Sequence, residues 1–571
     1  MITGKIKMPL LIFTAAALIA ATGKSIIQKN YTKPGDIIGC GPDVSNAIYA
    51  GADGKFITVL PGWGDHTYPV STNNDSAQIY FNQGLSMHYS YHQREALASF
   101  REAARFDSTA AMIYWGQALA SGPTYNYGYA YKQLKTIPAI IENMNRYAVN
   151  ASAKEKELIE AMNKRYDADD SADTKRNQLN EAYMAAMKPL VTQYPDDIDI
   201  KALYADAVML IHAWDFWNND GTAKPWTKEL VQYCEDILQK DPHHPGALHY
   251  YIHVTEASRD PQVALFCADS LKKLFPGIAH MVHMSSHEYE RTGKYALGVD
   301  ANEKADASLV LYDSLAKGLF LSVHVPHYYA VEAYCAISGA MREAISKSLT
   351  CRKSVSPTHV DTYDQYLYMF PELTMVRMGK WNDLLKDTAS LHADWTYAVI
   401  LHHFATGMAY ANTGNITEAQ KRLSKLVSAM KDTVLQIKFS PVKSSPHECA
   451  IIAENILAAT IHFEKKEYAA ALSAMQKAID AEDKLIYTEP KLWMIPARQY
   501  LGAYLLQLNK PEEAEAVYRQ DLVWNPGNGW SLLGLSQSLI AQNKMSEAAK
   551  YKPQYMYSFS HAEVMPTVSA Y

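Results

Sequence analysis

Histidines are concentrated in one stretch of the chain, and histidine is the commonest metal ligand among the side chains. Ten of the twenty histidines lie between residues 212 and 327, where an even distribution would place about four. These ten are His212, His243, His244, His249, His253, His280, His283, His287, His324 and His327. The concentration indicates a site that depends on imidazole groups.

Two segments of this stretch carry the same pattern. In each, two histidines stand four residues apart, a glutamate follows three residues later, and the second copy is offset from the first by 34 residues. The residues are His249, His253 and Glu256 in the first copy, and His283, His287 and Glu290 in the second. Residues four apart lie on one face of a helix, so each pair of imidazoles can bind one metal ion.

A transition metal is the ligand that this pattern favours, because imidazole binds copper, zinc and iron well. Neighbouring helices pack about 8–10 Å apart, so the two pairs could meet around one ion or around two. His280 is a fifth candidate ligand, and a second site could be completed by His212, His324 or His327. Glu256 and Glu290 could be ligands, could orient the imidazoles, or could act as a catalytic general base.

The histidine pattern is also compatible with a chain that holds no metal. Duplication of one repeat would copy its histidines without any metal, and histidines in a groove also bind anions or stack on aromatic ligands. The histidines could equally be satisfied within a core. The sequence has no HExxH motif, no Gly-x-Ser-x-Gly around Ser285 and Ser286, and no phosphate-binding Gly-rich loop, so the reaction, if there is one, is left open between hydrolysis and oxidation.

Histidines outside the two copies are weaker candidates. His66 lies in a non-helical segment and could fold over the groove as an outside ligand. His88 and His92 are expected in core or surface roles. His243 and His244 follow Pro242 in a turn and are expected to be exposed to solvent.

Helices must position these residues, since apolar residues recur at three- and four-residue steps from Ala77 onward. Short turns interrupt this pattern, for example at Gly414-Asn415, Asn509-Lys510-Pro511 and Asn525-Pro526-Gly527. Alternation of period two is scarce. The pattern predicts an all-α chain.

Small and large residues recur at fixed offsets in several helix pairs. One pair has Gly502, Ala514, Tyr518 and Pro526, and another has Gly84, Ala96, Phe100 and Ala103. These offsets resemble those of tetratricopeptide repeats, whose unit is a helix pair of 34 residues. The resemblance implies a right-handed superhelical solenoid over residues 77–550, with histidine-rich repeats at 245–310.

In such repeats, positions two, five, nine and twelve of the first helix face the concave groove. The resemblance places His249, His253, His280, His283, His287, Glu256 and Glu290 at those positions. It therefore implies that a small-molecule or peptide ligand, or a protein partner, would occupy a groove lined by these side chains.

Three further stretches resemble a group of bacterial exported tetratricopeptide proteins without an assigned reaction. They are Gly64–Thr72, Tyr80–Leu85 and Asn528–Leu532. This likeness implies an architecture and assigns no catalytic residue.

The ends of the chain suggest export. Residues 1–22 contain Lys5 and Lys7 before a short apolar run that is typical of a signal peptide, and no other segment is apolar enough to span a membrane. We expect an irregular lead-in over residues 23–76 and a C-terminal tail over 551–571. The six cysteines would allow one or two disulfides in a periplasmic or secreted protein.

Length and charge narrow the classes of protein further. The 571 residues are too many for one hydrophobic core, and the net charge of −6 argues against a general nucleic-acid binder. The leading hypothesis is an exported repeat protein whose histidine-lined pocket binds a transition metal, with or without catalysis on a small or peptide substrate. The alternative is a non-catalytic scaffold that binds a protein or peptide partner.

Overall fold

The computed structural model describes residues 50–51, 53–126, 128, 131–167, 173–315, 325–387 and 390–571. The signal-like segment 1–22, Cys40 and His324 lie outside these residues. In the described part, the chain forms α-helices joined by short turns, with two isolated β-bridges and no β-strand. The prediction of an all-α chain is confirmed.

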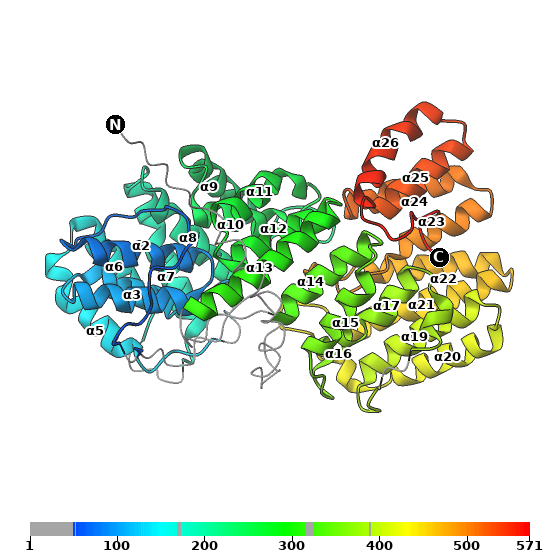
Figure 1. The fold of residues 1–571 in the computed structure, drawn as a ribbon, viewed down its shortest axis with the longest axis horizontal. Coiled ribbons are helices and arrows are strands. Elements are labelled where there is room, and N and C mark those ends of the chain that lie inside the picture. The colour runs from blue at the N-terminus through cyan, green and yellow to red at the C-terminus, as the bar shows by residue number, and fades with distance from the viewer. Residues whose placement is uncertain are drawn as a thin grey trace, which may run out of the picture.

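The described residues of the N-terminal half form twelve α-helices, which make up the lobe at the left of Figure 1. They are α2 (Asp75–Tyr89), α3 (Gln93–Phe106), α4 (Ala111–Ala120), α5 (Ile137–Tyr147), α6 (Ala153–Asn163), α7 (Arg176–Gln193), α8 (Ile198–Ile211), α9 (Thr227–Lys240), α10 (Pro245–Thr255), α11 (Leu265–Leu274), α12 (Ala279–Arg291) and α13 (Tyr295–Leu315).

The C-terminal half continues the array and forms the second lobe in Figure 1. Its helices are α14 (Val325–Ser338), α15 (Ala344–Ser354), α16 (Thr362–Tyr368), α17 (Phe370–Arg377), α18 (Trp381–Leu384), α19 (Thr396–Asn412), α20 (Ile416–Ala429), α21 (Pro446–Glu464), α22 (Tyr468–Glu482), α23 (Ala497–Gln507), α24 (Pro511–Trp524), α25 (Gly529–Ala541) and α26 (Met545–Ser558).

Small residues let the helices of a pair approach closely, as the repeat pattern predicts. A Cβ added at Gly84 would lie 2.8 Å from the Phe100 ring, and one added at Gly502 would lie 2.3 Å from the Tyr518 ring. A Cβ added at Gly534, on helix α25, would lie 2.2 Å from the ring of the same tyrosine. The expected tetratricopeptide-like packing of helix pairs, with a glycine against a large ring, is therefore confirmed.

Two hydrophobic cores fill the lobes, and α13 contributes to both. The first core gathers buried side chains between Ile57 and Tyr312, and the second between Tyr295 and Ala570. A small cluster formed by Ala279, Val282, Ala305, Leu309 and Tyr328 packs α12, α13 and α14 together. Helix α14, the first of the second lobe, thus packs directly on α12 and α13 of the first lobe.

The segment before α2 is extended and packs on the first helices. The backbone N–H groups of Phe56 and Leu60 donate hydrogen bonds to Glu102 and Gln83, and the Gly277 N–H donates to the Gly62 carbonyl. The lead-in therefore connects the first repeat to the turn before α12.

The other end of the chain and the cysteines differ from expectation. Helix α26 continues to Ser558, so the irregular C-terminal segment begins later than residue 551. The five described cysteines are buried free thiols rather than disulfide partners. Among the described helices, none has the length and apolar character needed to cross a membrane.

We expect Gly502→Ala to destabilise the C-terminal repeats by about 1–3 kcal/mol, because the added methyl group would overlap the Tyr518 ring. Chemical denaturation followed by circular dichroism would measure this cost. In a Tyr518→Leu background the same change should cost less or even stabilise, since alanine is the better helix former. An equal cost in both backgrounds would contradict the packing argument.

Candidate metal centre

Three helices, α10, α12 and α14, carry the histidines that come together. Helix α10 begins sharply, because Pro245 stands at its first position and the His244 side chain accepts a hydrogen bond from the Ala247 N–H. His249 and His253 project from α10, and α12 carries His280, His283 and His287. The sixth histidine, His327, comes from the first turn of α14.

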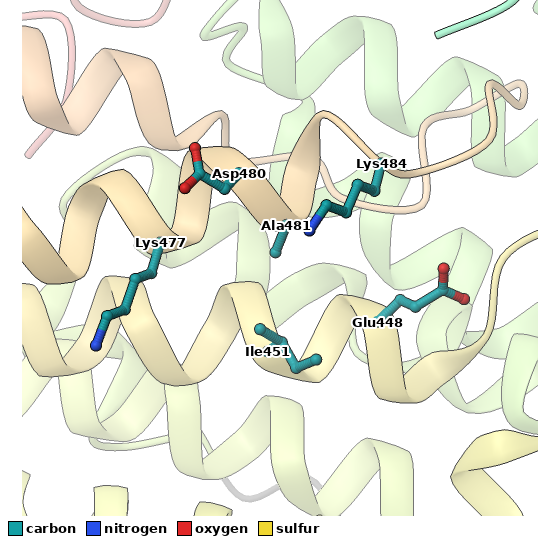
Figure 2. A pocket seen from close by; sticks show the side chains of 6 residues that line it. All are labelled: Glu448, Ile451, Lys477, Asp480, Ala481 and Lys484. Carbon is teal, nitrogen blue, oxygen red and sulfur yellow. The ribbon is translucent and has the colours of Figure 1, made fainter.

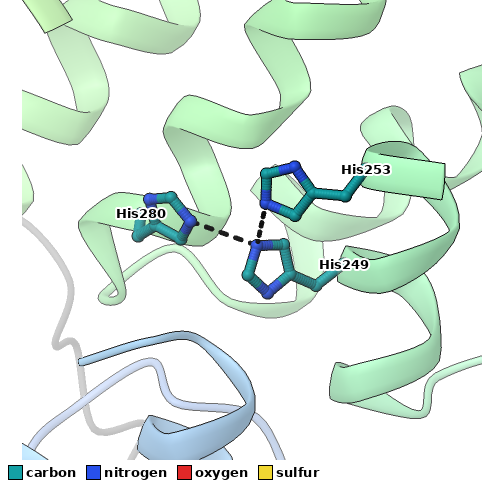
Figure 3. Close-up of side chains that lie close together, drawn as sticks. All are labelled: His249, His253 and His280. Atoms are coloured by element: carbon teal, nitrogen blue, oxygen red, sulfur yellow. Dashed lines mark hydrogen bonds between the residues drawn. The ribbon is translucent and has the colours of Figure 1, made fainter. Parts of the chain in front are cut away.

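The first cluster consists of His249, His253 and His280 (Figure 3). The Nε2 atom of His249 lies 3.1 Å from Nε2 of His253 and 3.1 Å from Nε2 of His280. All three rings are at most 3% exposed. The pair on α10 is thus completed by a histidine from the start of α12.

The second cluster consists of His283, His287 and His327. The Nε2 atoms of His283 and His287 are 3.0 Å apart, and the His327 ring lies 4.8 Å from that of His283, centroid to centroid. The pair on α12 is therefore completed by a histidine from α14, as the pair on α10 is completed from α12.

The outer nitrogen of each paired histidine faces an oxygen acceptor. His249 Nδ1 lies 2.7 Å from the Tyr89 carbonyl oxygen, and His283 Nδ1 lies 2.6 Å from Asn302 Oδ1. The remaining two share one carboxylate: Glu256 Oε1 lies 3.0 Å from Nδ1 of His253, and Glu256 Oε2 lies 2.8 Å from Nδ1 of His287. The Asn302 orientation is consistent, because its amide nitrogen donates to the Gly298 carbonyl.

These acceptors assign the tautomers of the four rings. A carbonyl oxygen or an ionised carboxylate only accepts, so with Glu256 ionised each Nδ1 carries the proton and each Nε2 carries a lone pair. His249 and His253 therefore direct two lone pairs at each other across 3.1 Å, and the pair on α12 does so across 3.0 Å. Such contacts are repulsive unless a cation lies between the nitrogens.

Protonation does not relieve both contacts at neutral pH. Burial lowers the pKa of His249 to about 4 and holds those of His253 and His287 well below the ordinary value. Burial also raises the pKa of Glu256. A protonated Glu256 could donate to the Nδ1 of either His253 or His287, and that ring would then carry its proton on Nε2. The other histidine pair would keep its two opposing lone pairs.

The two glutamates of the sequence pattern have different surroundings. Glu256 lies between the clusters, whereas both oxygens of the buried Glu290 carboxyl form no hydrogen bond within the described residues. Burial raises the pKa of Glu290 to about 8; Lys491 opposes this shift and Glu489 adds to it. Glu290 therefore lies among the charged groups beside α12 and does not orient an imidazole.

A third group, His66, Asp199 and His244, differs from the two clusters. His66 Nε2 lies 2.9 Å from Asp199 Oδ1, and the Tyr89 hydroxyl donates to the same oxygen across 2.7 Å. Because His244 Nδ1 accepts from Ala247 N–H, its Nε2 carries the proton and faces Asp199. Although burial opposes it, hydrogen bonds from both histidines hold the pKa of Asp199 well below its ordinary value. This group is therefore a carboxylate surrounded by hydrogen-bond donors. His244 has no lone pair available for a metal ion, because its Nδ1 lone pair already accepts the Ala247 N–H.

Several expectations for the remaining histidines need correction. His244 is fully buried, although the sequence predicted an exposed turn, because its side chain caps α10. His212 stacks on Trp226 with ring centroids 3.6 Å apart and joins neither cluster. His92, by contrast, has one of the two roles expected for it, because it is buried in the core, where its Nε2 accepts a hydrogen bond from the His280 N–H. His66 lies against Asp199 rather than over the clusters.

Two cavities lie away from the six clustered histidines. One of about 300 Å³ lies between α21 and α22 and is lined by Glu448, Lys477, Asp480 and Lys484 among others (Figure 2). The other, of about 520 Å³, lies beside His66 and is rimmed by aspartates from several segments. Neither contains a residue of the two clusters, so the clusters are buried sites rather than walls of these cavities.

We expect a pH effect on the metal-free protein that can be assigned to His88. Burial lowers the pKa of this histidine to about 3, so the unfolded state takes up its proton first as the pH falls below about 6.5. As the pH falls from about 6 to about 4, the free energy of unfolding of the wild type should decrease by about 1.4 kcal/mol per pH unit relative to that of a His88→Gln variant. Denaturation curves across this range would measure the difference, and parallel curves would contradict it. The variant His392→Gln, at an exposed site, is the control.

No protein-family model matches the chain, and no curated protein sequence matches it. Among solved structures, the chain is similar to the human IFIT1 dimer with m7Gppp-AAAA, at 12% identity and a TM-score of 0.30 over 85% of this chain and 90% of that chain. It is also similar to the APC/C hetero-tetramer Cut9-Hcn1, at 13% identity and a TM-score of 0.25 over 87% and 77% of the two chains. A third similar structure is yeast Tom70, at 11% identity and a TM-score of 0.25 over 84% and 93%.

Proposed function

We propose that this helical repeat protein binds transition-metal ions at its two clusters of three histidines. The main support is that the Nε2 lone pairs of two histidines point at each other in each cluster, across 3.1 Å in the first and 3.0 Å in the second. The Nδ1 atom of each of these four histidines lies against an oxygen acceptor. Metal-bound histidines characteristically donate their other N–H to a carboxylate or a backbone carbonyl. A cation between the nitrogens turns a repulsive contact into two bonds.

The distances within each cluster suit an ion of this kind. With metal–nitrogen bonds of about 2.0–2.1 Å, two nitrogens of a tetrahedral site are about 3.3–3.4 Å apart, so only a small outward shift of the rings is needed. Three imidazoles leave one coordination position for a ligand, which is the arrangement of catalytic rather than structural sites. Copper, zinc and iron all accept imidazole, and the ligand would be a small molecule or part of a peptide.

Export is part of the same proposal and rests on the signal-like residues 1–22. An exported metal protein would meet its metal and ligand outside the cytoplasm. The bacterial exported repeat proteins that the sequence resembles are consistent with this location.

The alternative function is a scaffold that binds a protein or peptide partner and holds no metal. The array of helix pairs supports it, because stacked helical repeats create extended surfaces that commonly bind other proteins. In a scaffold the buried histidines would serve the packing between α10, α12 and α14. The metal content of the protein distinguishes the two functions.

Elemental analysis of the untagged full chain should find close to two ions per chain after equilibration with copper, zinc and iron and removal of excess metal. His249→Ala/His253→Ala and His283→Ala/His287→Ala should each lose one ion, because each removes the pair that anchors one cluster. The control His212→Gln should lose none, since this histidine stacks on Trp226 outside both clusters. Circular dichroism would check that the variants fold. A wild-type chain that retains no metal would contradict the proposal. The scaffold function would then remain, and affinity purification of binding partners would test it.

Asn302→Leu should weaken metal binding at the second cluster by about 10–100-fold, as is usual when the acceptor of a ligating imidazole is removed. Asn302→Asp keeps an oxygen acceptor and is the matched control. Competition with a chromophoric chelator, in a His249→Ala/His253→Ala background, would isolate the second cluster. Equal affinities for the leucine and aspartate variants would show that the acceptor plays no part.

A further inference from the structure

The two histidine clusters are neighbours across one carboxylate. Rings that belong to different clusters lie close together, with centroids 5.9 Å apart for His280 and His283 and 6.2 Å apart for His253 and His287. Glu256 accepts a hydrogen bond from one histidine of each cluster. Ions bound in the two clusters would therefore form one dinuclear centre.

From this arrangement we infer, resting on the metal-binding function proposed above, that the dinuclear centre holds copper and binds dioxygen between its two ions. The six proposed ligands are imidazoles from three helices, and the two groups that they form consist of histidines alone. Glu256 forms a further group with His253 and His287, but its oxygens lie against the Nδ1 atoms of these rings. Copper stands at the top of the affinity order of divalent metals for such nitrogen sites.

The burial of the clusters favours singly charged ions. His249, His253, His280, His283 and His287 are at most 3% exposed, and a neutral imidazole brings no negative charge to offset that of a metal ion. Because burial of charge without compensation is costly, two Cu(I) ions fit this environment better than two divalent ions. Copper is the metal among the candidates that has a stable singly charged state.

A pair of Cu(I) ions also has the electrons that dioxygen needs. Each ion gives up one electron and becomes Cu(II), and dioxygen takes both and becomes a peroxide that bridges the two ions. No proton, further electron or leaving group is involved, and the reverse transfer releases dioxygen. Each ion has a free position for this ligand, because only three imidazoles bind it.

Access to the centre fits a small uncharged ligand. Five of the six histidines are at most 3% exposed, and His327 is the partly exposed member. A charged substrate would have to lose its hydration to enter such a site, whereas dioxygen carries no charge and is only two atoms long.

The test is to load the untagged full chain with Cu(I) under anaerobic conditions and then to add dioxygen. We expect two coppers per chain, uptake of one dioxygen for every two coppers, and an intense peroxide-to-copper charge-transfer absorption. The oxygenated protein should give no electron paramagnetic resonance signal, because the spins of two bridged Cu(II) ions couple. Removal of dioxygen under vacuum should reverse the absorption.

Variants that remove one member of either cluster provide the controls. His327→Gln and His280→Gln should each lose the oxygen uptake and, after air oxidation, show the signal of an isolated Cu(II) ion. His212→Gln should behave like the wild type. Two bound coppers that give the signal of two isolated ions and take up no dioxygen would overturn this inference and leave metal binding intact. A chain that binds zinc but no copper would also overturn it, whereas a chain that binds no metal would overturn the proposed function itself.

Discussion

The hydrogen bonds on the outer nitrogens of four histidines are the constraint on which the centre depends. Glu256, Asn302 and the Tyr89 carbonyl hold each proton on Nδ1 and leave each Nε2 lone pair facing inward. Without these acceptors, one imidazole of each pair could turn its N–H toward the other and the contact would be an ordinary hydrogen bond. The acceptors thus give the buried histidines the tautomer that the proposed metal binding requires.

The scaffold must bring acceptors and histidines together from distant parts of the chain. Tyr89 ends α2, Asn302 lies on α13, and the Glu256 carboxylate connects α10 with α12. Small residues let these helices approach closely, as where the Cys335 side chain lies against Gly298 on α13. The acceptors and the histidines are therefore held together by packed helices.

Arg291 links the centre to the end of the array. Its guanidinium donates to the carbonyls of Glu256 and Ser258 and also to that of Trp524, more than 200 residues later. The neighbouring turns meet as well, since a Cβ at Gly293 would lie 2.0 Å from the Gly527 carbonyl oxygen. The C-terminal repeats are thus packed against the end of α12, and the backbone of Glu256 is connected to them through Arg291.

The helices, their pairing and most of the cluster members could be predicted from the sequence, because helical periodicity and the 34-residue offset are patterns visible along the chain. The repeated pattern in the sequence predicted that His249, His253, His283, His287 and Glu256 belong to one site. The packing of the helices shows that His280 joins the pair on α10 and that His327 completes the pair on α12. It also shows that Glu290 forms no hydrogen bond with an imidazole of the described residues. The tertiary structure also identified the Tyr89 carbonyl and the Asn302 side chain as hydrogen-bond acceptors. Their positions in the sequence bear no regular spacing to the histidines. The physical reason is that a repeat fixes which face of a helix a residue occupies, whereas its neighbours across that face depend on how successive helices are translated and rotated against one another.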